Sequence, residues 1–169
     1  DAQTVFVATG AEAPVVAREE FSATSHAELE RARLAVQYRA YRGPSTADFL
    51  ANPPYPSFSL DAVYSVGLQY LGTPYRYGGD NPSGFDCSGF TQFVYAQFGV
   101  SLPHSVSGQS AMGTRISRED ARPGDIVIMP GHNGFYAGNG NILDSPRAGG
   151  VVSVRPIWTD NYYIVRIGI

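Results

Sequence analysis

The chain of 169 residues is 43% hydrophobic and 16% charged, and it carries a net charge of −3. A chain of this length and composition suits one folded domain with a small additional lobe. Its acidic balance argues against a nucleic-acid-binding surface, and it contains no apolar run long enough to span a membrane.

The first 57 residues are predicted to form an extension outside the main domain. Residues 1–24 show no clear hydrophobic period and suit an extended arm. Ser25 and Glu28 form a capping-box pattern, which predicts a helix over about residues 26–42. The stretch 43–57 holds four prolines and is interpreted as a linker or a strap across the surface. We therefore place a domain boundary near residue 57.

Helical patterns open the main domain, residues 58–169. Ser59 is a suitable N-cap for an apolar helix, and Gly72 is suited to end it. A glycine-rich polar segment follows, and then an apolar helical stretch begins near Cys87. A further helix is predicted over about residues 104–112.

The hydrophobic period changes to that of strands after a predicted turn at residues 122–125. Strands are predicted over residues 126–129, 132–137, 141–144, 151–157 and 162–167. Helices that precede antiparallel strands indicate an α+β fold, with the helices packed on one side of a central antiparallel sheet.

Cys87 is the only cysteine, so no intrachain disulfide can form. With three scattered histidines it makes no metal-ligand spacing. The sequence places Cys87 at or just before the first turn of a helix, where free N–H groups stabilise a thiolate, the nucleophilic form of cysteine. The alternative is a buried structural cysteine, which the polar, glycine-rich neighbourhood disfavours.

A cysteine nucleophile needs a base, and His132 is the best placed of the three histidines because it begins a predicted core strand. His26 lies in the extension and His104 at the start of a helix. A strand-end histidine without a role is the alternative for His132.

Asp144 is a candidate for the group that orients the imidazole. Residues 138–140 give a strong hairpin signal. A three-residue loop would pair Gly134 with Asp144 and place His132 and Asp144 on one face, one diagonal step apart. A two-residue loop would place them on opposite faces, because strand side chains alternate. An ordinary solvent-facing carboxylate is the alternative.

Residues 59–169 resemble the NlpC family of bacterial cell-wall cysteine peptidases. The motifs that carry the resemblance occur in order at residues 71–79, 85–90, 102–103, 123–127 and 132–140. Membership implies a papain-like α+β fold and hydrolysis of peptidoglycan stem peptides. The implied bond joins γ-D-glutamate to a diamino acid, either meso-diaminopimelate or lysine.

The resemblance also implies roles for individual residues. Cys87 matches the nucleophile, His132 the base and Asp144 the third polar residue. Tyr75 matches a tyrosine that supports the oxyanion, together with the backbone N–H of Cys87. The residues that match peptide contacts, one of them to the free amino end, are Asp86 and Ser88.

Three positions depart from the family pattern: Tyr77 replaces a common tryptophan, His104 a frequent arginine, and Asn133 an apolar residue. The chemistry of the Cys87–His132 pair is unaffected, whereas the substrate preference is open at Tyr77 and His104.

The resulting hypothesis is a cysteine endopeptidase that acts on peptidoglycan without a metal or organic cofactor. It is expected to be secreted or associated with the cell wall, and a chain that begins at Asp1 is compatible with a removed export signal. Residues 1–57 are a candidate cover for its groove. The alternatives are an N-acetylmuramoyl-L-alanine amidase with the same Cys–His pair and a non-catalytic wall-binding module. The sequence carries no oligomer signal.

Overall fold

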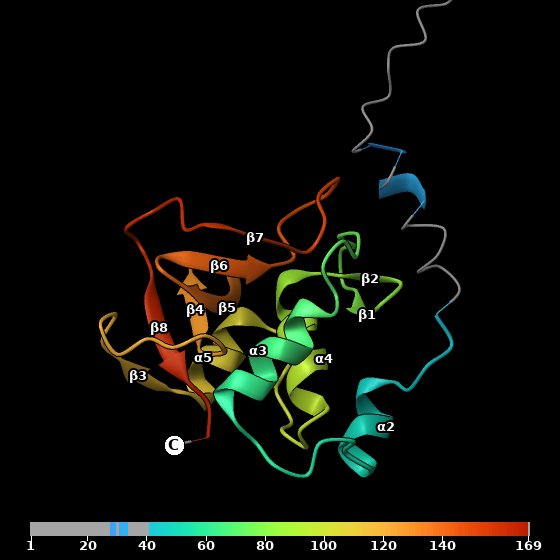
Figure 1. Cartoon of the computed structure of the whole chain (residues 1–169), viewed down its shortest axis with the longest axis horizontal. Coiled ribbons are helices and arrows are strands. Elements are labelled where there is room, and N and C mark those ends of the chain that lie inside the picture. Colours follow the sequence, from blue (N-terminus) through green and yellow to red (C-terminus); the bar gives the residue numbers. More distant parts are fainter. Residues whose placement is uncertain (1–27, 30, 34–40, 169) are drawn as a thin grey trace, which may run out of the picture.

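The computed structural model describes residues 28–29, 31–33 and 41–168 (Figure 1). The predicted arm over residues 1–24 therefore lies outside the described residues. The predicted helix over about residues 26–42 is described in part, and residues 28–29 and 31–33 are helical.

Four further helices lie within the described residues, and each begins after a side chain that caps its first turn. The capping residues are Ser45, Ser59, Asp86 and Ser105. The predicted helices of the main domain are confirmed. The six-residue helix over residues 46–51 was not predicted, and it lies in the stretch 43–57 that was interpreted as a linker or strap. The helices are α2 (Thr46–Ala51), α3 (Leu60–Leu68), α4 (Cys87–Ala96) and α5 (Val106–Met112).

A six-stranded antiparallel sheet forms the second layer, in the order β3-β8-β4-β5-β6-β7. All five predicted strands belong to it. The short edge strand β3 and a small hairpin, β1–β2, were not predicted. The strands are β1 (Asp80–Asn81), β2 (Gly84–Phe85), β3 (Thr114–Ile116), β4 (Ile126–Met129), β5 (His132–Gly138), β6 (Asn141–Asp144), β7 (Ser153–Pro156) and β8 (Tyr163–Arg166).

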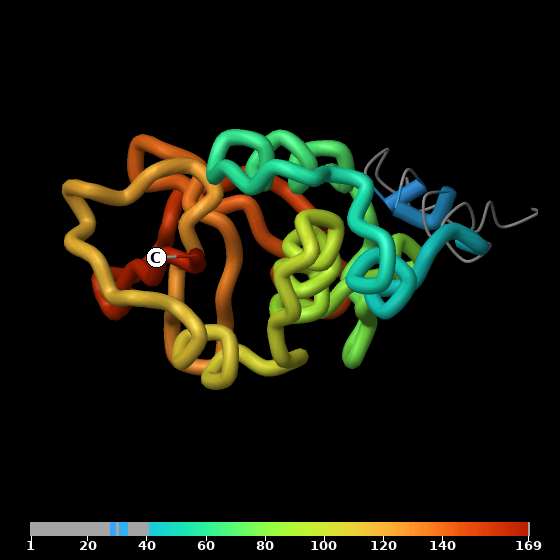
Figure 2. Tube along the Cα trace, turned by 90° about the horizontal axis from the view of Figure 1, so that it is seen from below, coloured from blue at the N-terminus to red at the C-terminus, as the bar shows by residue number. Residues whose placement is uncertain are grey.

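The core lies between α4 and the middle of the sheet. Phe90 of α4 meets Phe135 of β5 edge-to-face, with ring centroids 5.3 Å apart, and both side chains are fully buried. Figure 2 shows α3 and α4, in green and yellow-green, beside the orange and red strands. The predicted α+β fold with helices against a central antiparallel sheet is confirmed. Packing in this core fixes the orientation of α4 relative to β5.

Residues 41–57 pack against α4 through aromatic side chains. Phe49 of α2 meets Phe93 with ring centroids 5.3 Å apart, and Tyr55 stacks on Phe98 at 4.9 Å. The Tyr55 N–H also donates to the Gln97 carbonyl at 3.2 Å. This stretch therefore covers the far side of α4, and the domain boundary near residue 57 stays a prediction.

A buried ion pair ties β8 to the turn that precedes β4. Asp125 is fully buried, and Arg166 donates from Nε and Nη2 to its two carboxylate oxygens, both at 2.8 Å. The hydroxyl of Tyr95 donates to the neighbouring Gly124 carbonyl at 2.8 Å. The predicted turn at residues 122–125 thus anchors both the sheet and α4.

Candidate active site

Cys87 is the first residue of α4, as the sequence predicts. The Asp86 carboxylate caps the helix by accepting the Gly89 N–H at 2.6 Å. The thiol is free and only partly exposed. Its position places the sulfur beside the N–H groups that open the helix, where a negative charge is stabilised.

The β1–β2 hairpin approaches the first turn of α4 so closely that no side chain fits between them. A Cβ atom added to Gly89 would lie 1.9 Å from the carbonyl oxygen of Gly79, which is backbone and cannot rotate away. The same oxygen accepts the N–H of Asp86 at 2.9 Å. Gly89 therefore lets the loop that carries Asp86 and Cys87 pack onto the helix.

We expect Gly89→Ala to displace this loop, to lower the free energy of unfolding by about 1–3 kcal/mol, and to slow alkylation of Cys87 by iodoacetamide. Gly67→Ala in α3 is the matched control, because the nearest contact of its new Cβ is a side-chain atom of Leu143 at 3.1 Å and not backbone. Urea unfolding and timed mass spectrometry of the alkylated protein measure the two effects. Equal behaviour of the two variants would contradict the packing role of Gly89.

His132 lies at the start of β5, with Asp144 and Cys87 as its polar neighbours. Its Nε2 atom lies 2.6 Å from Oδ2 of Asp144, and the Cys87 side chain is near enough to raise the pKa of the imidazole. An imidazole has two ring nitrogens, so Nδ1 remains for the sulfur. The structure therefore brings Cys87, His132 and Asp144 together in one line of contacts.

The β5–β6 hairpin decides between the two loop lengths that the sequence leaves open. The loop has two residues, Asn139 and Gly140, since Gly138 pairs with Asn141, but the expectation that such a loop places His132 and Asp144 on opposite faces is wrong. A β-bulge between Tyr136 and Gly138 then shifts the register by one residue, and Phe135 pairs with Leu143. Beyond the bulge the register is the one a three-residue loop would have set. This is why His132 and Asp144 share a face.

The environment of His132 favours its charged form. Burial by itself lowers the pKa of this imidazole, but the hydrogen bonds to Asp144 and Cys87 and their negative charges outweigh burial and raise the pKa to about 9. The Asp144 carboxylate is fully buried beside the ring. The site is therefore built to hold an imidazolium next to the sulfur.

Arg155 and Trp158 complete this arrangement, and the sequence reasoning missed both. Arg155 donates to the two carboxylate oxygens of Asp144, from Nε at 3.1 Å and from Nη2 at 2.7 Å. Its guanidinium lies 4.2 Å from the centre of the Trp158 ring, which also lies 5.6 Å from the ring of His132. The strand over residues 151–157 was predicted, but its pairing beside β6 was not.

Tyr75 lies near the Cys87 side chain. Burial raises the pKa of its hydroxyl, and so do the negative charges of Cys87 and Asp86 nearby. The Tyr75 N–H donates to the Gly150 carbonyl at 2.9 Å. Tyr75 and Asp86 thus border Cys87, as the sequence predicts.

Residues of the extension reach the same region. Glu28, Arg31 and Ala32 border a cavity of about 370 Å³ whose other side is formed by Pro74, Tyr75, Gly149 and Gly150. The extension therefore lies beside Tyr75, and its effect on turnover stays a prediction.

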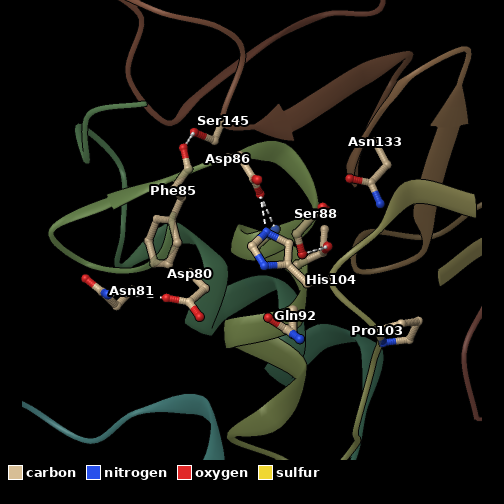
Figure 3. Close-up of polar contacts among 12 residues, drawn as sticks. Asp80, Asn81, Phe85, Asp86, Ser88, Gln92, Pro103, His104, Asn133 and Ser145 are labelled. Atoms are coloured by element: carbon tan, nitrogen blue, oxygen red, sulfur yellow. Dashed lines mark hydrogen bonds and ion pairs between the residues drawn. The ribbon is translucent and has the colours of Figure 1, made fainter. Parts of the chain in front are cut away.

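His104 also lies at the site, although no catalytic role was predicted for it. Its Nε2 atom lies 2.8 Å from Oδ1 of Asp86, the same oxygen that caps α4 (Figure 3). The histidine therefore touches the site next to Cys87 without competing with His132 for the sulfur. The signal in the sequence was its position directly after the Leu102-Pro103 motif.

A buried amide network supports the site from behind. Gln109 is fully buried and donates from Nε2 to the carbonyl of Ser88 at 2.8 Å, while its Oε1 accepts from Asn133 at 2.8 Å. Ser88, the predicted peptide contact, is itself buried, and its carbonyl belongs to this network. Asn133, which departs from the family pattern, has Gln109 as its hydrogen-bond acceptor. The network links α4, α5 and β5 next to His132.

Among the described residues, no group of three or more His, Cys, Asp or Glu could hold a metal ion. Within the same part of the chain, no helix is long and apolar enough to cross a membrane.

A cysteine at a helix start, a histidine on the facing antiparallel sheet and a carboxylate behind it define a papain-like domain. The sequence profile of the NlpC/P60 family matches residues 72–167, and the chain belongs to this family. The resemblance seen in the sequence is thereby confirmed.

Two similar curated proteins carry the names of peptidases. The probable endopeptidase p60 of Listeria grayi is 39% identical over 119 residues, which are 66% of this chain and 23% of that protein. The gamma-D-glutamyl-L-lysine dipeptidyl-peptidase of Bacillus cereus is 33% identical over 115 residues, which are 63% of this chain and 34% of that protein. The matches thus span about a quarter to a third of these relatives.

Solved structures agree with the family. The NlpC/p60 domain of the peptidoglycan hydrolase SagA superposes with a TM-score of 0.61 at 34% identity, covering 65% of this chain and 100% of that one. RipD of Mycobacterium tuberculosis, described as a non-catalytic NlpC/p60 domain protein adapted to peptidoglycan binding, superposes with a TM-score of 0.55 at 29% identity, covering 66% of this chain and 99% of that one.

Proposed function

We propose that the protein is a cysteine endopeptidase that cleaves the bond between γ-D-glutamate and the diamino acid of peptidoglycan stem peptides. The observation that carries the proposal is the continuous line of contacts from Cys87 through His132 and Asp144 to Arg155. A wall-binding module has no need of a sulfur paired with an imidazole that a buried carboxylate orients.

The proposed reaction uses Cys87 as nucleophile and His132 as base and acid. His132 holds the proton of the thiol while the sulfur attacks the amide carbon of the γ-glutamyl group. The C–N bond then breaks, and the leaving amine takes the proton from His132. Water, deprotonated by His132, hydrolyses the thioester and releases the γ-carboxylate and the free thiol.

Asp144 is proposed to keep the imidazole in its productive orientation, and Arg155 to hold Asp144. The Tyr75 hydroxyl and the Cys87 N–H are proposed donors to the oxyanion of the tetrahedral intermediate. Asp86 is the proposed partner of the free amino end of the peptide, and Ser88 a further peptide contact. This proposal requires no metal or organic cofactor.

The substrate implies the place of action. Peptidoglycan lies outside the cytoplasmic membrane, so we propose that the protein is secreted or associated with the cell wall.

Digestion of defined muropeptides, followed by mass spectrometry, tests the proposed function, with Cys87→Ala as the inactive reference. We expect the native protein to yield a fragment that ends in γ-D-glutamate and a fragment that begins with the diamino acid. Release of the intact stem peptide from muramic acid would assign an amidase instead. Binding of muropeptides without any product would assign a non-catalytic module, as in RipD.

A further inference from the structure

A cavity of about 360 Å³ opens beside His132. Its lining consists of Gly131, His132, Pro146, Arg147, Arg155 and Trp158. Pockets that hold small ligands in proteins have volumes of about 300–1,000 Å³. The cavity is therefore large enough for one amino-acid side chain and the backbone around it.

The exposed lining of this cavity is cationic. Arg147 and Arg155 supply two guanidinium groups, and none of the lining residues is acidic. Asp144 neutralises part of the charge of Arg155, but its side chain is fully buried and is not presented to the cavity. Arg155 donates only its Nε and one Nη2 hydrogen to Asp144, and its side chain is 33% exposed, so further N–H donors remain for a ligand.

Among the described residues, Arg147 has fewer partners than Arg155 has. It lies on the exposed loop after β6, where its carbonyl accepts the Gly150 N–H at 2.9 Å. Its guanidinium has no salt bridge within the described ranges of the chain. A guanidinium without an internal carboxylate is suited to bind one from a ligand, with two parallel hydrogen bonds.

The position of His132 decides which half of the substrate meets this cavity. In the proposed reaction the amine leaves with the proton of His132, so the diamino acid lies beside the imidazole when the bond breaks. The glutamyl half stays on the sulfur, near Asp86 and Tyr75. The cavity that His132 shares with Arg147 is therefore the place of the leaving diamino acid.

We propose that this cavity is a carboxylate-binding subsite for the leaving residue, so that the enzyme prefers meso-diaminopimelate to lysine. This inference rests on the proposed function. Lysine and meso-diaminopimelate differ by one carboxylate on the terminal side-chain carbon, and the two arginines line the cavity in which we place this carbon. The preference departs from the L-lysine in the name of the Bacillus cereus relative.

Two tetrapeptides that differ only in this carboxylate test the subsite, namely L-Ala-γ-D-Glu-meso-diaminopimelate-D-Ala and its L-lysine counterpart. We expect kcat/KM for the diaminopimelate peptide to be about ten- to a hundredfold higher, the effect of a hydrogen bond to a charged group. Arg147→Gln is expected to remove most of this preference by lowering kcat/KM for the diaminopimelate peptide.

Arg122→Gln is the matched control for loss of an arginine. Its side chain is 58% exposed and forms a weak pair with Asp61 at 3.8 Å, on the turn at the opposite end of β4 from His132. This variant is expected to keep the full preference. Equal cleavage of both peptides by the native protein would overturn the subsite, and so would an unchanged preference in Arg147→Gln.

A binding experiment separates the subsite from the reaction. Trp158 is the only tryptophan of the chain and lines the cavity, so its fluorescence reports occupancy. In Cys87→Ala, the diaminopimelate peptide is expected to change this fluorescence at a concentration about tenfold lower than the lysine peptide. If the native protein cuts neither peptide but this order of binding holds, the proposed function fails and the subsite stands. If the diaminopimelate peptide does not bind more tightly than the lysine peptide, the proposed subsite fails as well.

Discussion

Replacing Asp144 with asparagine is expected to lower kcat/KM by about 10³–10⁴-fold, the size of effect known when the orienting carboxylate of a catalytic histidine is removed. Asp144 accepts hydrogen bonds from His132 and Arg155 at once. A carboxamide replaces one acceptor oxygen with an NH2 donor and carries no charge, so it cannot accept all three of these hydrogen bonds and does not stabilise the imidazolium. The imidazole then loses its orientation toward Cys87.

The same substitution has a signature in the pH profile. In the native protein the charged imidazole donates its proton to the leaving amine, so activity falls as the pH rises through the pKa of His132, about 9. Asp144 raises this pKa and burial lowers it. The alkaline limb of kcat/KM is therefore expected to move to lower pH in Asp144→Asn.

Measurement of kcat/KM between neutral and strongly alkaline pH checks both parts of this prediction. Asp61→Asn is the control, because Asp61 carries the same charge on an exposed side chain that contacts only Arg122 at 3.8 Å among the described ion pairs. A variant at Asp144 that loses activity with an unmoved alkaline limb would show that the carboxylate does not act through His132.

The second large effect concerns stability. We expect Asp125→Ala to lower the free energy of unfolding by about 3–5 kcal/mol, the cost of leaving one member of a buried ion pair alone. Arg166 is 19% exposed and donates to both oxygens of Asp125. Removing the carboxylate strands this guanidinium between β8 and the turn before β4, and also removes the acceptor of the Arg122 N–H.

Urea unfolding measures this cost. Asp61→Ala removes a carboxylate from an exposed pair and is expected to cost about 0–1 kcal/mol. The double variant Asp125→Ala/Arg166→Ala is expected to lose less than the sum of the two single variants, because removal of both partners leaves no stranded charge. Strictly additive losses would contradict a direct interaction between Asp125 and Arg166.

The helix of Cys87 shows how far local sequence goes. Asp86 supplies a cap and Gly89 follows at the position that the cap contacts, so the start of α4 is specified within four residues. Burial of Phe90 against Phe135 then fixes the orientation of the helix on the sheet. Both features were predictable, because cap and periodicity act between close neighbours in the chain.

Short elements were not predicted, because contacts with distant parts of the chain stabilise them. Helix α2 has six residues and no buried side chain. Isolated helices of this length are unstable, so intrinsic propensity says little about them. Ser45 and Asp48 do form a capping box, but the helix is held by the contact of Phe49 with Phe93, far along the chain.

The sequence by itself determined the family, the helix that presents Cys87, the strand that begins with His132, and the candidate Asp144. Only the tertiary structure decided the rest. The bulge in β5 aligns His132 with Asp144 although the loop has only two residues, and no sequence signal indicated this bulge. Arg155 and His104 joined the site because β7 pairs with β6 and the loop before α5 crosses Asp86. Periodicity describes neighbours along one element, whereas these contacts depend on which elements lie next to each other.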